Sequence, residues 1–410
     1  MKYDMIIIGG GLTGLTCGIA LQKAGKKVAV VAAGQSTLHF NSGSFDLLGK
    51  DENGQRVENP LLACKGLSAG HPYHKVADMT QRAEEARKLL EEAGVGVAGD
   101  AECNHYRLTP MGLLKPAWLT INGMVTSESA EKLAWKKVTL MNVRGFLDVP
   151  MEFLADNLAK MGVEVERKDF TTPELEFARR SPSEMRATNV EKVLERDDNL
   201  KRMVEAIRRE NATGDVILLP AFQSSVKELD QVVGKTVRFV ATLPPSVPGV
   251  YVQAALRRRF YELGGMLFPN DRVNGGDFSG NRLNYVTTEK LTGERLEAGQ
   301  FILATGSFES RGLMSNYQKV YEPIFGLDII DADADREKWT EYYFFDAQPY
   351  MKYGVKTDDR LHALIDGKPI ENLYAAGSVL SGHNAVKLGD RQGVDMLTAL
   401  EVANNILNRR

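Results

Sequence analysis

Glycines with a fixed spacing near the N-terminus are the residues of this chain best suited to a defined chemistry. An apolar run, Met5–Ile8, leads into the sequence G-G-G-L-T-G, and an apolar pattern with helical spacing follows. A strand, then G-x-G-x-x-G, then a helix is the order that binds nucleotide phosphates. Gly9 permits the tight turn, Gly11 lets a pyrophosphate approach the backbone, and Gly14 lets the helix pack close to the strand. The N–H groups of the first helical turn then face the phosphate. The predicted phosphate-binding residues are Gly9, Gly10, Gly11, Leu12, Thr13 and Gly14.

One group that usually accompanies this motif is absent from the sequence. A second strand, Val28–Val31, follows as expected, and a dinucleotide site usually has Asp or Glu near its end for the adenosine ribose. Here Ala32–Gln35 occupy that stretch, and no carboxylate occurs between Asp4 and Asp46. No arginine in that stretch suggests a 2′-phosphate either, so a nicotinamide cofactor loses support. We predict a site that holds a phosphate, with Gln35 or a backbone group as the alternatives for a ribose contact.

The candidates for proton transfer are histidines outside any recognisable catalytic pattern. The sequence has no Ser-His-Asp order, metal-ligand spacing or paired-carboxylate motif above background, so we predict no metal site. A phosphate ester substrate would also need cationic side chains close to the cofactor. The histidine candidates are His39, His71, His74, His105 and His383, and the cationic candidates are Arg107, Arg144, Arg311, Lys387 and Arg391.

Three separate strands each run into a glycine, and this pattern predicts the architecture. Besides the first strand, Phe301–Ala304 runs into Gly306 and Asn372–Ala376 runs into Gly377. In a doubly wound parallel sheet, ligands bind at the carboxyl ends of the strands, where glycines let the backbone approach a flat cofactor. We therefore predict an α/β fold with a Rossmann-type doubly wound cofactor domain. Thr305, Gly306, Gly377 and Ser378 join the predicted cofactor site.

These strands predict a cofactor domain that is discontinuous in sequence. A chain of 410 residues is expected to form two or three domains. We place the cofactor domain at residues 1–50 and 300–410, and an inserted mixed α/β cap, which also extends the sheet, at residues 51–299. Further expected helices are 81–93, 151–161, 250–263 and 394–407, and further expected strands are 136–143, 163–165 and 216–220.

Composition narrows the class of protein. The chain is 43% hydrophobic and 26% charged with a net charge of −3, which argues against nucleic acid as the main partner. The sequence has no apolar stretch of membrane-spanning length and no signal-peptide pattern, so we expect a cytoplasmic location. Cys17, Cys64 and Cys103 are far apart, which argues against disulfides and an iron–sulfur cluster within the chain.

Several segments resemble known flavoproteins. The glycine turn and the two later strand-to-glycine segments resemble the two-dinucleotide-fold flavoproteins, and Tyr353–Asp358 is similar to the strand before the last cofactor segment of fumarate-reductase-like members. A closer similarity is to the B subunits of the bacterial anaerobic glycerol-3-phosphate dehydrogenases. The segments that carry it are Gly34–Ser44, Thr242–Gly249, Glu322–Asp328 and Phe344–Pro349.

This resemblance implies a flavoprotein subunit of a three-subunit respiratory enzyme. Such an enzyme oxidises sn-glycerol 3-phosphate to dihydroxyacetone phosphate and delivers electrons to the quinone pool. Its A subunit carries another flavin, and its cysteine-rich C subunit carries iron–sulfur clusters and the membrane attachment. The resemblance therefore implies peripheral association with the inner membrane through a partner.

The resemblance also implies FMN as the cofactor, with FAD as the alternative. The missing ribose carboxylate agrees with FMN, which has no adenosine, and Ser378 stands where the wider flavoprotein pattern has Asp. The segment before the last helix, Lys387–Gly393, has fewer glycines than relatives show there. By the same resemblance, Ser42, Gly43 and Ser44 join the cofactor site and His39, after the second strand, is the candidate base for alcohol oxidation.

Three hypotheses stay open at the level of the sequence. The chain can be a flavin-dependent dehydrogenase subunit, in which the substrate chemistry belongs either to this chain or to the A subunit. It can instead be a stand-alone FAD oxidoreductase of the fumarate-reductase or amine-oxidase type. The third hypothesis is a non-catalytic assembly subunit that keeps the flavin fold for its shape.

Overall fold

The computed structural model describes residues 1–181, 183, 185–196, 198–222, 229–230, 233–330 and 335–408. Contacts divide the chain into two compact units. Unit 1 comprises Met1–Leu38, Asp46–Val95 and Gln253–Arg410, and unit 2 comprises His39–Phe45 and Gly96–Val252. The predicted boundaries at residues 50 and 300 differ from these, because 51–95 and 253–299 belong to unit 1. Each unit is described by itself below.

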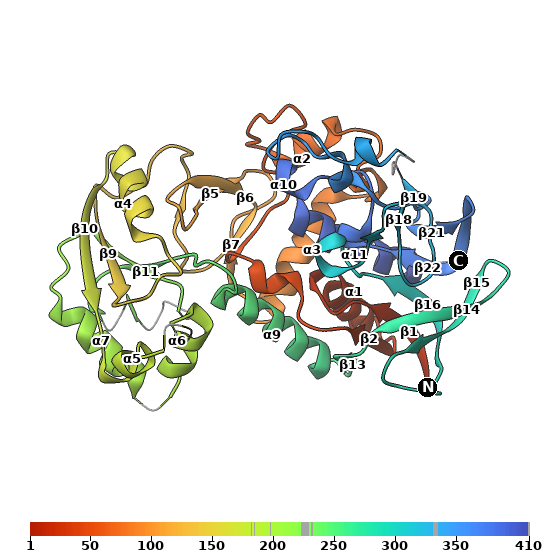
Figure 1. Ribbon diagram of the computed structural model, residues 1–410, viewed down its shortest axis with the longest axis horizontal. Coiled ribbons are helices and arrows are strands. Elements are labelled where there is room, and N and C mark those ends of the chain that lie inside the picture. Colours follow the sequence, from red (N-terminus) through yellow and green to blue (C-terminus); the bar gives the residue numbers. More distant parts are fainter. Residues whose placement is uncertain are drawn as a thin grey trace. The chain divides into compact units, whose positions relative to one another are not determined.

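Unit 1 is built on an eight-stranded mixed sheet (Figure 1). Its order is β13–β2–β1–β16–β15–β14. Outside this path, β22 pairs with β16, and β21 pairs with β22. The bounds are β1 Lys2–Ile8, β2 Val28–Ala32, β13 Met266–Pro269, β14 Val273–Ser279, β15 Arg282–Thr288, β16 Leu296–Leu303, β21 His362–Ile365 and β22 Lys368–Ala375. Five strands run parallel to one another, namely β13, β2, β1, β16 and β22. In contrast, β14 and β15 form an antiparallel hairpin, and β15 is antiparallel to β16.

Strand β16 is the branch point of this sheet. Along one edge it pairs with β1, and along the other its first residues pair with β15 and its last residues with β22. Its register aligns Ile8 with Leu303 and Leu303 with Ala375, so three parallel strands end side by side. Residues 301–303 are buried, whereas residues 297–300 alternate between exposed and half-buried. The prediction of a strand from Phe301 was therefore too short, because the polar half pairs with a solvent-facing hairpin and lacks an apolar run.

Helices cover the parallel part of this sheet. Helix α11 (Arg391–Leu407) packs against α1 (Leu12–Lys23) and α3 (Met79–Glu92), and Figure 1 shows the three together. Unit 1 also contains the short α2 (Pro60–Ala63) and α10 (Ala385–Leu388), and the part of α9 from Gln253 onward. Helix α9 spans Val247–Glu262 and not 250–263 as predicted, because Pro248 fits the first turn of a helix, where its missing N–H is not needed.

Unit 2 contains a separate four-stranded parallel sheet in the order β10–β9–β11–β12. Its strands are β9 Lys137–Val143, β10 Glu164–Phe170, β11 Val216–Pro220 and β12 Val237–Val240, and its helices are α4 Met151–Lys160, α5 Pro173–Ala178, α6 Ala187–Leu194 and α7 Asn199–Arg209. Two three-stranded sheets complete it. They comprise β3 Ser44–Phe45, β7 Leu119–Ile121 and β4 Val97–Ala98, then β6 Leu114–Ala117, β5 His105–Leu108 and β8 Thr126–Ser127.

Candidate functional site

The glycine turn between β1 and α1 contains two glycines that the fold itself requires. Gly9 has a φ of +121°, and a Cβ there would lie 2.1 Å from the carbonyl oxygen of Ala304. A Cβ on Gly14 would lie 1.9 Å from the carbonyl oxygen of Gly9. The turn, the end of β16 and the first turn of α1 therefore touch through backbone atoms. This close packing confirms the physical role predicted for both glycines.

Gly11 differs from these two because protein atoms leave space beside it. A Cβ on Gly11 would meet one neighbour within 4 Å, the Cβ of Ser36 at an ordinary 3.5 Å. Gly11 is also the N-cap of α1, and among the described residues no side chain caps that helix end. The N–H groups of the first turn are thus available to an anion, and a side chain at Gly11 would occupy the space of that anion.

A cavity of about 340 Å³ lies at this edge of the sheet, and we call it the strand-end cavity. Its lining includes Gly9–Thr13 from the glycine turn, Ala33–Thr37 after β2, and Ala304–Ser307 after β16. The Oγ1 atom of Thr305 is buried and has no hydrogen-bond partner within the described ranges. An open backbone cradle and an unsatisfied buried hydroxyl fit a bound phosphate-bearing group. Leu12, Thr13, Thr305, Gly306 and Ser378 of the predicted site all line this cavity.

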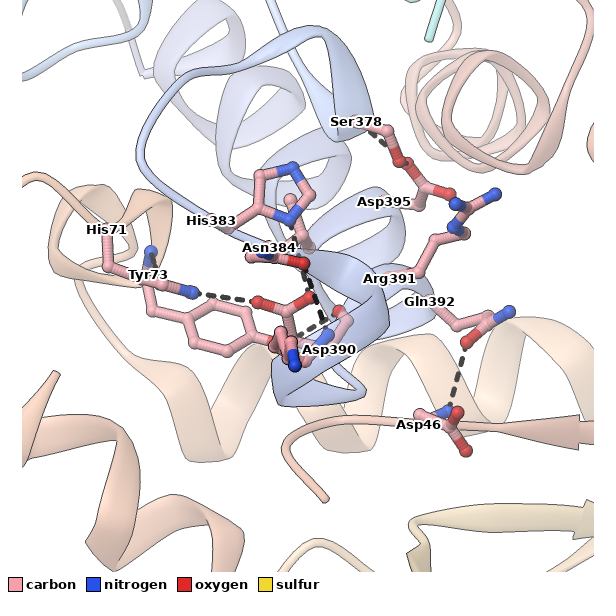
Figure 2. Close-up of polar contacts among 12 residues, drawn as sticks. Asp46, His71, Tyr73, Ser378, His383, Asn384, Asp390, Arg391, Gln392 and Asp395 are labelled. Carbon is pink, nitrogen blue, oxygen red and sulfur yellow. Dashed lines mark hydrogen bonds and ion pairs between the residues drawn. The ribbon is translucent and has the colours of Figure 1, made fainter. Parts of the chain in front are cut away.

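Asp395 on α11 joins the glycine turn to the end of β22, and sequence reasoning missed it. Its Oδ1 atom accepts hydrogen bonds from the Thr13 hydroxyl at 2.9 Å and from both the N–H and the hydroxyl of Ser378 at 2.8 Å (Figure 2). Gly377 has a φ of +77°, and a Cβ there would strike Thr13 and Asp395. Asp395 lines the strand-end cavity, so a carboxylate stands beside Ser378 although the chain has no Asp at that position.

Besides Asp395 and Glu309, two further carboxylates line the strand-end cavity. Asp271 and Glu289 come from segments far along the chain from β2. Asp271 is satisfied by protein, since it accepts hydrogen bonds from Thr288 Oγ1 at 2.7 Å and from the N–H groups of Arg272 and Lys290. Glu289 is exposed and lies 4.0 Å from Arg272. The sequence near β2 could not indicate either residue, because Asp271 precedes β14 and Glu289 follows β15, far along the chain.

Four residues of the predicted site belong to unit 2. His39 is half-buried, and its carbonyl oxygen accepts a hydrogen bond from Ser246 N–H. The Ser42 hydroxyl accepts from Arg107 at 2.8 Å, and the buried Ser44 hydroxyl shares a 2.9 Å hydrogen bond with Thr120. Gly43 has a φ of +85°. These contacts hold the loop within its own unit, and the roles of its residues in cofactor binding and catalysis stay predictions.

A second cavity of about 300 Å³, here the histidine cavity, adjoins the first. The two share Ser307, Glu309, Ser378 and Arg391 as lining residues. His383 lines the histidine cavity, and its Nδ1 atom lies 3.3 Å from Oδ1 of Asp390. Among the candidate histidines, His383 therefore lies at a cavity in contact with the strand-end site.

Asp390 is a fully buried carboxylate between two histidines (Figure 2). His71 Nε2 lies 2.9 Å from the other carboxylate oxygen, Oδ2. Burial alone would raise the pKa of Asp390, but its hydrogen-bonded contacts with His383 and His71 outweigh burial and hold that pKa well below its usual range. Asp390 also occupies the N-cap position of α11, where the helix dipole favours an anion. Asp390 is thus ionised.

The remaining candidates have other partners. His74 Nε2 contacts the carbonyl of Leu67, and burial lowers the pKa of His105, which lies in unit 2. Of the cationic candidates, Arg311 and Arg391 line the strand-end cavity, and Arg391 is paired with Glu309. Arg107 and Arg144 belong to unit 2, and Lys387 donates to the carbonyl of Phe345.

The cysteines are free thiols, as the sequence predicts. Cys17 and Cys64 are buried and Cys103 is exposed. Burial raises the pKa of both buried thiols to about 12, so neither is a thiolate at neutral pH. Within the part of the chain that the structure describes, no helix has the length and apolarity to cross a membrane.

Comparison with known proteins gives the class of this molecule. Residues 4–390 match the family described as an FAD binding domain. The cavity at the ends of parallel strands and the sequence match together define a flavoprotein oxidoreductase with a Rossmann-type fold, as predicted. The chain is similar over 99% of its length to L-proline dehydrogenase from P. horikoshii, with 15% identity, 93% of that chain covered and a TM-score of 0.36, which supports no further conclusion.

More similar relatives share one name. The chain is 40% identical to the B subunit of anaerobic glycerol-3-phosphate dehydrogenase from Yersinia enterocolitica, covering 100% of this chain and 99% of that protein. It is 38% identical to the protein of the same name from Pectobacterium atrosepticum, over 99% of each, and 36% identical to that of Actinobacillus succinogenes, over 100% and 99%. The chain belongs to the family of anaerobic glycerol-3-phosphate dehydrogenase B subunits, which confirms the resemblance seen in its sequence.

Proposed function

We propose that this chain binds a flavin in the strand-end cavity and oxidises sn-glycerol 3-phosphate to dihydroxyacetone phosphate, with electrons passed to the quinone pool. The observation that carries the proposal is the cavity at the aligned ends of β1, β16 and β22, with an uncapped helix and an open glycine beside it. The name of the relatives supports the substrate. When bound, the flavin supplies a hydride acceptor.

The flavin phosphate fits the N-terminus of α1, held by Gly9–Thr13, with Thr305–Gly306 and Ser378 on the neighbouring strand ends. Gly14 and Gly377 support this site by close packing, Gly14 on the Gly9 carbonyl and Gly377 on Thr13. Within this site the chain does three things. The backbone N–H groups of α1 bind the phosphate, the Thr305 hydroxyl gains a partner, and Asp395 fixes the orientation of Ser378. We retain Ser42, Gly43, Ser44 and His39 as proposed members of the site.

The identity of the flavin depends on the end of the cavity near β2. The missing carboxylate after β2 supports FMN, as predicted, whereas the matched family is described by FAD. Glu289 is the exposed carboxylate at this end that can accept from a ribose hydroxyl.

Acid release of the cofactor from the purified full chain, with identification by mass, tests both points. FMN is expected. If FAD is found, the Glu289→Gln variant should bind FAD several-fold more weakly than the wild type, and FMN affinity should be unchanged. A protein that neither retains nor rebinds either flavin would contradict the proposal.

The name of the relatives supports membership in a multi-subunit complex, because each is the B subunit of a dehydrogenase. We propose the A subunit and the iron–sulfur, membrane-anchoring C subunit as its partners, and a cytoplasmic location peripheral to the inner membrane. Co-purification of the full chain with co-expressed A and C subunits, from the membrane fraction, tests this. Recovery of the chain alone, with both other subunits present, would contradict it.

A non-catalytic assembly role is the second candidate. It is favoured by the loop that carries His39, because the polar groups of Ser42 and Ser44 are engaged by protein side chains of their own unit. Single-turnover reduction of the flavin-loaded chain by glycerol 3-phosphate separates the two roles. Bleaching of the flavin absorbance supports catalysis on this chain, and an unreduced flavin supports assembly.

A further inference from the structure

We infer that the histidine cavity is the substrate subsite of this chain, and that His383 is the base that takes the hydroxyl proton of a small secondary alcohol. This inference rests on the proposed function and names the atom where the proton goes. Three observations carry it. They are the hydrogen-bond directions around Asp390, the position of the second ring nitrogen of His383, and the continuity of the two cavities.

The hydrogen bonds assign a tautomer to each histidine. The backbone N–H of Tyr73 donates to His71 Nδ1 at 3.2 Å, so that nitrogen has no proton. His71 Nε2–H therefore donates to Asp390 at 2.9 Å. Burial lowers the pKa of His71, which keeps the ring neutral in this arrangement. His71 thus stabilises the Asp390 carboxylate without neutralising it.

Because Asp390 is an anion and accepts only, His383 Nδ1 must donate the hydrogen bond between them. When this ring has a single proton, its lone pair is therefore on Nε2. Figure 2 shows this second ring nitrogen on the side away from Asp390. His383 is itself buried at 5% exposure, yet it lines the histidine cavity, so a ligand there can reach its ring. A carboxylate that orients a histidine and stabilises its protonated form is the arrangement of a general base.

The histidine cavity also offers the groups that a small polar alcohol needs. Arg391 provides a cation shared with the strand-end cavity, and an anionic substrate group would compete for it with Glu309. Tyr350, Tyr353 and Phe308 add an aromatic surface to the lining. A ligand here is next to Ser378, which is one of the residues that line both cavities.

In the proposed step the O–H bond of the alcohol breaks and its proton passes to His383 Nε2. The oxidised flavin, when bound, would accept the hydride from the C–H bond as the carbonyl forms. Asp390 is a positioning residue, since it acts through His383. The charged or titratable groups around His383 are Asp390, His71, Arg391, Glu309, Tyr350 and Tyr353.

Kinetics of the flavin-loaded full chain with glycerol 3-phosphate test the catalytic residue. The His383→Gln variant should lower the rate of flavin reduction by about 10²–10⁴-fold with little change in KM. Asp390→Asn should lower it less and displace the pH profile of kcat/KM. His362→Gln is the matched control and should behave as the wild type, because the His362 ring pairs with Asp358 at 2.9 Å and is not among the residues that line the two cavities. A wild-type rate in His383→Gln would overturn the inference.

A second readout needs no flavin. Long-range ¹⁵N NMR of the histidine rings in the apoprotein should show the Nδ1–H tautomer for His383 and the Nε2–H tautomer for His71. The opposite tautomer at His383 would overturn the inference even if the variant is slow. If the wild type itself fails to reduce its flavin, the proposed function fails, and the NMR result still decides the tautomer.

A different part of unit 1 carries a second inference. Tyr342, Tyr343, Phe344 and Phe345 follow one another and are 92%, 68%, 86% and 85% exposed. We call them the aromatic loop. The geometry points to a docking surface for the apolar face of a single partner subunit of the same complex, an inference that rests on the proposed complex membership.

The aromatic loop is held in shape by hydrogen bonds to its backbone. Gln348, which is buried, accepts from the Glu341 N–H and donates to the Tyr343 carbonyl, both at 2.9 Å. Lys387 donates to the carbonyl of Phe345 at 2.5 Å. The rings pair edge to face, Tyr342 with Tyr343 and Phe344 with Phe345. A surface ordered before binding loses little entropy when a partner covers it.

Size and charge favour a protein over a lipid surface. Each aromatic side chain presents about 150–250 Å², so the loop exposes on the order of 600 Å², close to the ~800 Å² per partner of a stable interface. The neighbouring residues 335–346 contain four acidic and two basic side chains, at Asp335, Glu337, Glu341, Asp346, Arg336 and Lys338. With Lys387, which contacts Phe345, the border has four acidic and three basic groups, so it lacks the cluster of basic residues that binds an anionic membrane.

Co-purification of the full chain with the co-expressed A and C subunits tests this surface. The double variant Phe344→Ser, Phe345→Ser should fold normally and lose at least tenfold in recovered complex. Phe177→Ser, at a phenylalanine of α5 that is 70% exposed, is the control and should assemble normally. Normal assembly of the double variant would overturn the inference.

Flotation with phosphatidylethanolamine–phosphatidylglycerol vesicles tests the competing surface. Flotation of the isolated wild-type chain, lost in the double variant, would also overturn the assignment to a protein partner, because it identifies a lipid one. If the wild type recovers neither the A nor the C subunit, complex membership fails instead.

Discussion

At the scale of single residues, the glycine turn contains two kinds of glycine with different tasks. Gly9 and Gly14 are required by contacts within the protein, since a Cβ on either would overlap a backbone oxygen. Gly11 has ordinary space around it and faces the strand-end cavity. Folding and ligand binding are therefore separable by substitution within one short motif.

We predict that Gly11→Ala leaves the thermal unfolding of the apoprotein within about 1 °C of the wild type but reduces flavin affinity at least tenfold. The added Cβ occupies space intended for the phosphate and does not touch backbone. Differential scanning fluorimetry and fluorescence titration with the flavin measure the two effects. Gly14→Ala is the contrasting control, expected to lose several kcal/mol of stability by forced overlap.

The residue scale also shows where sequence reasoning stops. The glycine motif could be predicted because its turn, helix end and phosphate cradle are formed by neighbouring residues. The Asp390–His71 contact joins residues 319 positions apart, and Asp395 reaches Thr13 across 382 positions. Such pairs depend on the packing of α11 against the rest of unit 1, which no local pattern of side chains specifies.

At the scale of elements, α11 organises both cavities. Asp390 is at its N-cap, Arg391 begins it, and Asp395 lies one turn later. The helix was predicted from its apolar spacing, with a start three residues late at Val394. Its early start matters because the polar residues of that first turn are the ones that reach the site.

Asp395→Ala should destabilise the chain by about 2–4 kcal/mol, because the Thr13 hydroxyl and the two Ser378 donors lose one shared acceptor in a buried place. Urea unfolding measures the loss. Asp395→Asn keeps an acceptor oxygen and should lose less than half as much. An equal loss in both variants would show that the charge and not the hydrogen bonds matters.

Helix α6 provides a prediction on pH. Burial, aided by the charge of Glu195, raises the pKa of Glu191 to about 7. Between the unfolded value of about 4.3 and 7, the unfolded chain loses its proton first, so this group costs stability as pH rises through that window and the cost is complete above it. Glu191→Gln should therefore stabilise at pH 8 by about 1–2 kcal/mol after allowance for solvent screening, with no gain at pH 4.5. Chemical unfolding at both pH values measures this, and the exposed Glu205→Gln serves as the control.

At the scale of the whole molecule, the two units provide an internal comparison. The strand-end cavity is lined by unit 1 alone, while unit 2 has its own parallel sheet. The sequence predicted the cofactor sheet from its strand-to-glycine pattern. It did not predict that unit 2 forms a second parallel sheet. The sequence of a short buried strand such as Val216–Pro220 does not indicate which strands it pairs with.

Removal of the flavin should reduce amide hydrogen-exchange protection in β1 and β16 by at least tenfold and leave β9 and β11 nearly unchanged. A ligand stabilises the cooperative unit that binds it. Mass-resolved exchange of holoprotein and apoprotein measures both pairs in one sample. Equal loss in the two sheets would mean that the units unfold together.

The branching of the sheet at β16 has a consequence for the order in which the protein is made. The glycine turn leaves the ribosome among the first residues, but the strands that complete its cavity wall arrive with β16 and then β22, and Asp395 arrives later still. The phosphate-binding site is therefore complete only after nearly the entire chain has been synthesised. We therefore expect flavin insertion to follow synthesis of α11, and a chain truncated before α11 to bind flavin much more weakly than the full chain.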